Sequence, residues 1–186
     1  MSKTLCEHGI LRSWHPTDKT LSREAVDSII AWRDYEFADR SDSAVLKDPC
    51  NLNCLDEWEK EWFKESDSAI THVYLANMIH ISEWKSTIGL LRGAAALLRA
   101  SASPGGDSDV AKGSIIVYGP FKVDGQQTAP SNAAFDESLR SRDPQWAIRD
   151  MDQDVGEEAA RHGLKIVDRV QMPANNFILI LEPVDL

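Results

Sequence analysis

The stretch at residues 114–125, SIIVYGPFKVDG, decides the fold. Its first five residues, 114–118, are rich in β-branched and aromatic side chains and predict a buried strand. Gly119 and Pro120 then end the strand, because proline cannot donate to the ladder of a central strand. Aromatic and basic side chains flank this stop, at Tyr118, Phe121 and Lys122. The pattern predicts a core strand whose end carries side chains with polar and charged groups.

Strand and helix patterns alternate on the N-terminal side of this stretch. Residues 70–76, ITHVYLA, predict a second buried strand. A helix is expected from residue 83 to about residue 100, since its apolar side chains recur every three or four positions. Residues 23–37 predict another helix, for which Ser22 is a good N-cap. The small, polar segment 101–112, SASPGGDSDVAK, predicts a flexible surface loop.

The C-terminal part predicts two adjacent strands, at residues 164–171 and 177–181, joined as a hairpin. Alternating strands and helices that finish in a hairpin indicate an open α/β sheet, mostly parallel, with an antiparallel edge. No internal repeat or second domain is evident, so one domain over residues 1–186 is expected.

Composition narrows the class of protein. The chain carries a formal net charge of -10, which argues against nucleic acid or an anionic membrane as a partner. No apolar run reaches the roughly 18 residues of a membrane helix, and no signal peptide is evident. Three cysteines, an odd and sparse count, fit reduced thiols in the cytosol or nucleus. Cys50 and Cys54 are poorly spaced for zinc, so no metal site is expected.

Ligands of such sheets bind beyond the carboxyl ends of the strands, so the residues that follow each strand are the candidates. Asp18 could hold the hydroxyls of a ribose, or could be a simple turn residue. Asn77 offers a donor and an acceptor, or could order its loop. His80 can exchange a proton near neutral pH, or could be a half-buried structural ring.

Residues 118–146 mix aromatic and polar side chains, as the walls of ligand sites do. The alternative is a well-ordered loop and a surface helix, on which four charged residues form surface ion pairs: Asp136, Arg140, Arg142 and Asp143.

Five segments together resemble one family. WHPTD, ANMIHISEW, YGPFKVDG, SNAAFDESLRSRDPQWAIRD and MPANNFILILEP are similar to the methyltransferase-like 26 family (domain of unknown function 938), in the family's order. The family is classed with the seven-stranded, Rossmann-like methyltransferases that use S-adenosylmethionine (SAM). The resemblance implies SAM as cofactor and a small molecule as methyl acceptor.

The resemblance also implies roles for residues. Cofactor-binding positions are Asp18, Asn53, Cys54 and Asn77. His80 is the first candidate base and Tyr118 the second. The expected substrate side comprises Phe121, Lys122, Asn132, Asp136, Arg142 and Trp146, of which Lys122 and Arg142 are the candidates to hold an anion.

The chain departs from the family at one point, because it has no glycine-rich GxGxG loop. The resemblance therefore implies a sheet that lacks its first, central strand, in a chain truncated before that loop, whose exposed strand edges invite self-association. Two alternatives remain open: a methyltransferase-fold protein that binds a partner without catalysis, and a nucleotide-binding oxidoreductase, which also needs a glycine loop.

Overall fold

The computed structural model describes residues 13–36, 47–65, 70–101 and 113–184. The chain forms two compact units, Met1–Asn53 and Cys54–Leu186. The expected single domain remains a prediction. Most of the predicted surface loop, residues 102–112, lies outside the described residues. No helix among the described residues is long and apolar enough to cross a membrane.

The described part of the N-terminal unit comprises a short parallel strand pair and the helix α2 (Arg23–Glu36). β1 (Thr17–Asp18) pairs with β2 (Cys50–Asn51) in parallel. α2 begins where predicted, and the Ser22 hydroxyl accepts a hydrogen bond from the backbone N–H of Ala25 at 3.1 Å. That bond satisfies one of the free N–H groups of the first turn, which confirms Ser22 as the cap.

The C-terminal unit is built on a four-stranded mixed sheet with the order β3-β4-β8-β7. β3 (His72–Ala76) and β4 (Ser114–Pro120) are parallel, and β8 (Asn176–Pro183) is antiparallel to both β4 and β7 (Leu164–Met172). The sequence prediction of an α/β fold with a C-terminal hairpin is thus confirmed.

The sheets of the two units are separate. β1 and β2 form their own two-stranded sheet, and β5 (Lys122–Val123) and β6 (Gln126–Gln127) form a third. Among the described residues, β3 pairs on one side alone, with β4. The C-terminal unit thus has the expected antiparallel edge, while the absence of a central strand remains a prediction.

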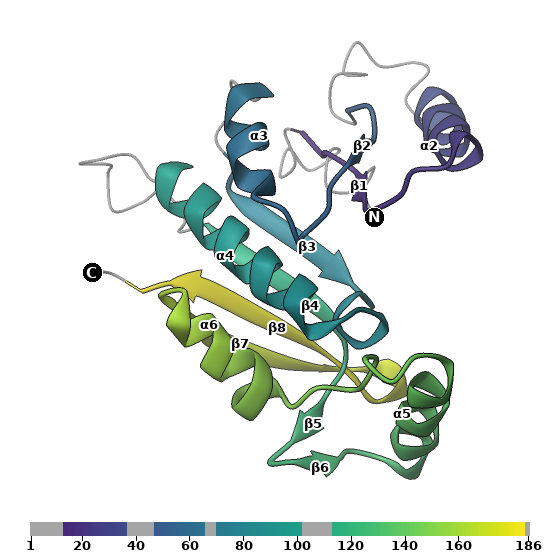
Figure 1. The fold of residues 1–186 in the computed structure, drawn as a ribbon, viewed down its shortest axis with the longest axis vertical. Helices are drawn as coiled ribbons and strands as arrows, with labels where there is room; N and C mark the ends of the chain where they lie inside the picture. The colour runs from purple at the N-terminus through teal and green to yellow at the C-terminus, as the bar shows by residue number, and fades with distance from the viewer. Residues whose placement is uncertain (1–12, 37–46, 66–69, 102–112, 185–186) are drawn as a thin grey trace. The chain divides into compact units, whose positions relative to one another are not determined.

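One face of the four-stranded sheet supports the core. Ile115 and Val117 of β4 are fully buried, as are Leu179 and Leu181 of β8, because alternate residues of a strand point to the same face. α4 (Trp84–Ser101) and α6 (Glu157–Arg161) cover one face of this sheet (Figure 1). The opposite face of β4 carries Ile116, which is half-buried.

Two glycines of α4 let this helix pack closely against Cys54 and the helix α3 (Trp58–Glu65). α3 presents the indole of Trp58, whose Nε1 donates to the carbonyl of Gly89 at 3.1 Å. A methyl group on Gly89 would lie 1.7 Å from the backbone oxygen of Cys54, and one on Gly93 would lie 2.4 Å from the Trp58 ring. Only glycine therefore fits at these two positions.

The first prediction concerns this close packing. Gly89→Ala should lower the free energy of unfolding by about 3 kcal/mol or more, because the clash is with backbone that cannot rotate away. Gly156→Ala is the matched control, since its methyl would meet no atom closer than 3.4 Å and its backbone is helical. It should be neutral or stabilising by up to about 1 kcal/mol. Urea unfolding followed by tryptophan fluorescence measures the stability of both variants. Equal losses of stability would contradict the close packing of α4 at Gly89.

Candidate functional site

The ends of β3 and β4 bring two of the candidate side chains, Asn77 and His80, together. Asn77 follows β3 in a left-handed conformation (φ 56°), which asparagine tolerates better than most residues. Its backbone N–H donates to the carbonyl of Tyr118 at 2.8 Å. A 3₁₀ turn, Ile79–Ile81, then carries His80 back toward the end of β4. Asn77 and His80 therefore lie at the carboxyl edge of this pair of strands, and their role toward a ligand stays a prediction.

His80 lies inside this edge of the sheet, with 5% of its surface exposed. A methyl group on Gly119 would lie 3.5 Å from Nδ1 of His80 and 3.9 Å from Oδ1 of Asn77. Because Gly119 has no side chain, β4 places no side-chain atom against the His80 ring at this position. The His80 ring meets the ring of Phe135 edge to face, with centroids 5.5 Å apart and planes at 68°.

The imidazole of His80 is neutral at physiological pH. Burial lowers the pKa of His80 to about 4, and the positive charge of Arg142 adds to this effect. A neutral imidazole keeps one nitrogen lone pair, so it can accept a proton from a hydroxyl group that lies beside it.

Tyr118 occupies a different side of β4. Its hydroxyl oxygen accepts a hydrogen bond from Nδ2 of Asn176 at 2.9 Å, so the hydroxyl hydrogen remains available to donate. Successive residues of a strand point to opposite faces. His80 lies on the face of β4 to which Gly119 points, so the Tyr118 ring points to the other face. The structure therefore separates the two candidate bases.

α5 (Pro130–Arg142) carries most of the expected substrate-side residues and lies beyond the ends of β3 and β4, next to the β5–β6 hairpin (Figure 1). Its Asp136 is buried and accepts a hydrogen bond from the backbone N–H of Ile148 at 2.7 Å. Three further donors surround this carboxylate: Gln127 (3.2 Å), Arg140 (3.4 Å) and Lys122 (3.6 Å). Asp136 and Lys122 thus hold the hairpin and helix together.

Two other predicted residues on this side are also engaged within the protein. Phe121 is 2% exposed and belongs to the core. Nδ2 of Asn132 donates to the Thr128 hydroxyl at 3.0 Å and to the Asn175 carbonyl at 3.3 Å, which ties the start of α5 to the β7–β8 turn. The expected role of Phe121 and Asn132 in substrate binding stays a prediction.

Near the end of α5, Arg142 is exposed and Trp146 is half-buried. The guanidinium carbon of Arg142 lies 5.4 Å from the centre of the Trp146 ring, and its Nε donates to the Ser138 carbonyl at 3.4 Å. A second pair of this kind, Arg149 over Trp84 at 5.4 Å, was not predicted, because the two residues are 65 positions apart in the sequence.

Asp150 is a structural residue that the sequence reasoning missed. Burial alone would raise its pKa, but backbone N–H groups of Gln153, Gly125 and Asp152, with the charge of Lys122, lower the pKa overall. Its carboxylate therefore joins the β5–β6 turn to the π-helical turn Met151–Gly156.

The predicted ribose-binding acid lies in the N-terminal unit. Asp18 ends β1, is exposed, and its Oδ1 accepts a hydrogen bond from the Thr20 N–H at 3.0 Å. Its backbone carbonyl accepts from the Leu52 N–H at 2.8 Å, so Asn53 comes just after β2 at the same edge of this strand pair. Cys54 is buried and belongs, with Asn77, to the C-terminal unit.

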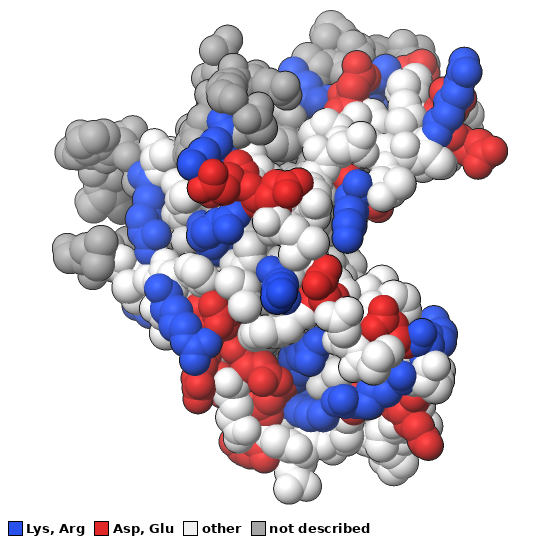
Figure 2. All heavy atoms as spheres, viewed as in Figure 1, with Lys and Arg blue, Asp and Glu red and all other residues white. Residues whose placement is uncertain are grey.

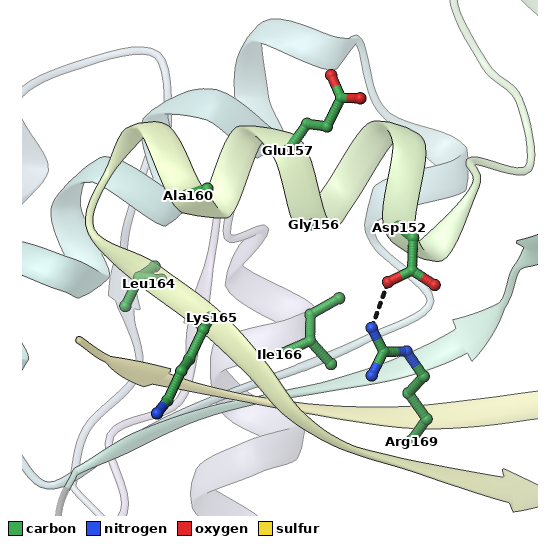
Figure 3. Close-up of a pocket in the computed structure, with 8 residues that line it drawn as sticks. All are labelled: Asp152, Gly156, Glu157, Ala160, Leu164, Lys165, Ile166 and Arg169. Carbon is green, nitrogen blue, oxygen red and sulfur yellow. Dashed lines mark hydrogen bonds and ion pairs between the residues drawn. The ribbon is translucent and has the colours of Figure 1, made fainter.

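A separate depression of about 340 Å³ lies between β7 and the helices before it. Its lining carries an ion pair between Asp152 and Arg169, with Ile166 beside it (Figure 3). None of the predicted site residues contributes to it.

The second prediction concerns the buried acid of α5. Asp136→Ala should lower the free energy of unfolding by about 3 kcal/mol, because the Ile148 N–H and Lys122 lose their shared partner. Glu137→Ala removes the same charge from the neighbouring, exposed position of α5 and should change stability by less than about 0.5 kcal/mol. Chemical denaturation of both variants tests this; equal losses would mean that Asp136 contributes no more than its charge.

The third prediction follows from the low pKa of His80. Between pH 6.5 and about 4 the unfolded chain binds a proton at His80 that the folded chain does not, so this residue makes stability fall as the pH falls through that range. The stability difference between the native chain and His80→Gln should therefore depend on pH in this range and be constant above it. His72→Gln, which removes an exposed imidazole of β3, is the control. A flat difference for His80→Gln would contradict a buried, neutral ring.

Comparison with solved structures shows the fold. An O-methyltransferase family protein from Burkholderia thailandensis matches 99% of this chain at 15% identity, with a TM-score of 0.66. An O-methyltransferase family 2 protein from Planctomyces limnophilus, in complex with apigenin, matches 98% at 13% identity, with a TM-score of 0.66. NcsB1, an O-methyltransferase from neocarzinostatin biosynthesis in complex with SAM and 2-hydroxy-5-methyl naphthoic acid, matches 98% at 14% identity, with a TM-score of 0.58.

The matched parts are 47%, 46% and 46% of those proteins, so the chain spans about half their length. At these identities the likeness establishes a methyltransferase-like fold. A family model described as "Protein of unknown function (DUF938)" matches residues 10–182. Since this match spans nearly the whole sequence, the chain belongs to the DUF938 family.

Proposed function

We propose that this protein takes part in SAM-dependent methyl transfer to a hydroxyl group of a small molecule, with His80 as the proton acceptor. The observation that carries the proposal is a buried, neutral imidazole at the carboxyl edge of β3, in a sheet with the methyltransferase-like fold. The motifs quoted above support the methyltransferase-like 26 family as part of this proposal.

Two residues of the N-terminal unit, Asp18 and Asn53, carry acceptor oxygens of the kind that the hydroxyl and amine groups of a nucleoside bind. The Asp18 carboxylate is exposed and uses Oδ1 for one local hydrogen bond, which leaves acceptor positions for vicinal ribose hydroxyls. By the resemblance, Asn53 stands at the position of the acid that faces the adenine amine. Cys54 and Asn77 stay cofactor-binding candidates of the C-terminal unit. SAM, when bound, would supply an electrophilic methyl group, which the hydroxyl oxygen would gain as the sulfur–methyl bond breaks, with S-adenosylhomocysteine as the leaving group.

His80 contributes by position and by protonation state. A hydroxyl that is methylated must lose its proton, and His80 would take it on the ring nitrogen that carries the lone pair. Its low pKa makes it a weak base, so the proposal favours an acidic hydroxyl, such as a phenol, over an aliphatic alcohol. Alignment of the reactants is expected to supply most of the rate enhancement, roughly 7–11 kcal/mol of the barrier.

A second candidate function is binding without catalysis. The printed sequence has no GxGxG loop, the element through which such folds bring backbone close to a cofactor. A methyltransferase-fold protein without that element could serve as an interaction module. Cofactor binding separates the two functions.

The fourth prediction is therefore a binding measurement on the 186-residue chain. Isothermal titration with SAM or with S-adenosylhomocysteine should show saturable heat, and Asp18→Ala should weaken the binding about tenfold or more, because a carboxylate that accepts hydrogen bonds from two hydroxyls is lost. Asp27→Ala, which removes an exposed acid from α2, is the matched control and should bind as the native chain does.

If a chain that is folded by circular dichroism shows no heat with either compound, the transferase proposal fails and the non-catalytic function is favoured. If both Asp variants bind like the native chain, Asp18 is not a ribose ligand.

A further inference from the structure

Arg142 differs from most arginines of the C-terminal unit in its partners. Four of those arginines pair with a carboxylate: Arg92 with Glu59, Arg140 with Asp136, Arg161 with Glu158 and Arg169 with Asp152. Within the described residues Arg142 has no carboxylate within 4 Å, and its guanidinium lies on the Trp146 ring. Of the two residues expected to hold an anion, Lys122 already faces Asp136, so Arg142 is the one whose charge is available.

The same face of α5 carries an exposed aromatic ring. Phe135 and Arg142 are seven positions apart, two helical turns, and so lie on one side of the helix. Phe135 is 37% exposed, although its ring meets the buried His80 ring in an edge-to-face arrangement. Trp146 lies just beyond the helix end and is half-buried. In Figure 2 several basic side chains lie close together over the region of β5, β6 and α5, in a protein whose net charge is -10.

We propose that the methyl acceptor is a planar organic anion, a hydroxylated aromatic carboxylate, whose carboxylate binds Arg142 beside Trp146 and whose ring lies against Phe135 near His80. This inference rests on the proposed function for the fate of the hydroxyl, but the binding itself does not require methyl transfer. The guanidinium fork matches a carboxylate with two parallel hydrogen bonds, and exposed aromatic rings favour a flat partner.

The arrangement couples substrate binding to the strength of the base. Arg142 is the charged side chain whose field acts on His80; the other groups around the ring, Asn77, Phe135 and Gly119, carry no charge. Asp136 on the same helix is directed to the Ile148 N–H and its own cations. A carboxylate bound to Arg142 offsets the positive charge, so the pKa of His80 rises and the imidazole becomes a better acceptor when the substrate is present.

Three small probes test the class of ligand with the 186-residue chain and no cofactor. Salicylate carries the ring, the hydroxyl and the charge; salicylamide lacks the charge; acetate lacks the ring. Titrations followed by NMR, with the His80 ring resonance assigned from the spectrum of His80→Gln, should give a Kd for salicylate at least about tenfold lower than for either other probe. The pKa of His80 should rise from about 4 with salicylate and stay unchanged with salicylamide.

Variants of two neighbouring arginines separate a specific contact from general charge. Arg142→Gln should raise the Kd for salicylate about tenfold and raise the pKa of His80 in the free protein. Arg142→Lys keeps the charge but loses the planar fork, so it should keep the low pKa and bind salicylate more weakly than the native chain. Arg140→Gln, whose guanidinium faces Asp136, should leave both quantities as they are.

Salicylate affinity that is unchanged in Arg142→Gln would overturn the proposal, and so would equal binding of salicylamide. Binding of acetate as tight as that of salicylate would overturn the aromatic part of the ligand class. These outcomes are independent of the calorimetry with SAM. If the chain binds salicylate but not SAM, the anion site stands and the transferase proposal fails. If the chain binds SAM but not salicylate, the transferase proposal stands and the anionic substrate is ruled out.

Discussion

The parallel pairing of β3 with β4 is the constraint on which the site depends. The ladder continues one step beyond β3, through the hydrogen bond from the Asn77 N–H to the Tyr118 carbonyl. This bond fixes the left-handed residue that turns the chain, and the following 3₁₀ turn buries His80 next to Gly119. A side chain longer than a methyl at residue 119, or a loss of register between the two strands, would displace the imidazole from the edge of the sheet.

Polar groups around this edge divide into two kinds. Asp136, Asn132 and Asp150 are buried, and their hydrogen bonds hold α5, the β5–β6 hairpin and the β7–β8 turn in place. His80 and Arg142 have no comparable internal partners among the described residues, and they lie near exposed or half-buried aromatic rings. The first kind builds a rigid frame. The second kind is the one that we propose for a ligand, in line with the rigid support that a preorganised site requires.

Sequence patterns predicted the parts of the fold that depend on local periodicity. β3, β4, the β7–β8 hairpin, α2 and α4 are found at or near the expected residues, because alternate burial in strands and burial at every third or fourth position in helices produce periodic sequence patterns. The predicted end of β4 before Gly119 was wrong, since Gly119 and Pro120 still pair with β8. The sequence also indicated that Asn77 and His80 follow a buried strand. It could not show that Asp136 is buried, since its partners Ile148 and Gln127 come from separate segments. The cation–aromatic pair of Arg149 and Trp84 is non-local in the same way.

The central claim is that His80 accepts the proton of an acidic hydroxyl during methyl transfer from SAM. The most direct measurement is the incorporation of labelled methyl from SAM into hydroxylated aromatic carboxylates, followed by mass spectrometry, for the native chain and for His80→Gln. Here we expect a methyl ether product from the native chain and a loss of about 10²-fold or more in rate for the variant. A product formed at the same rate by both proteins would contradict the claim.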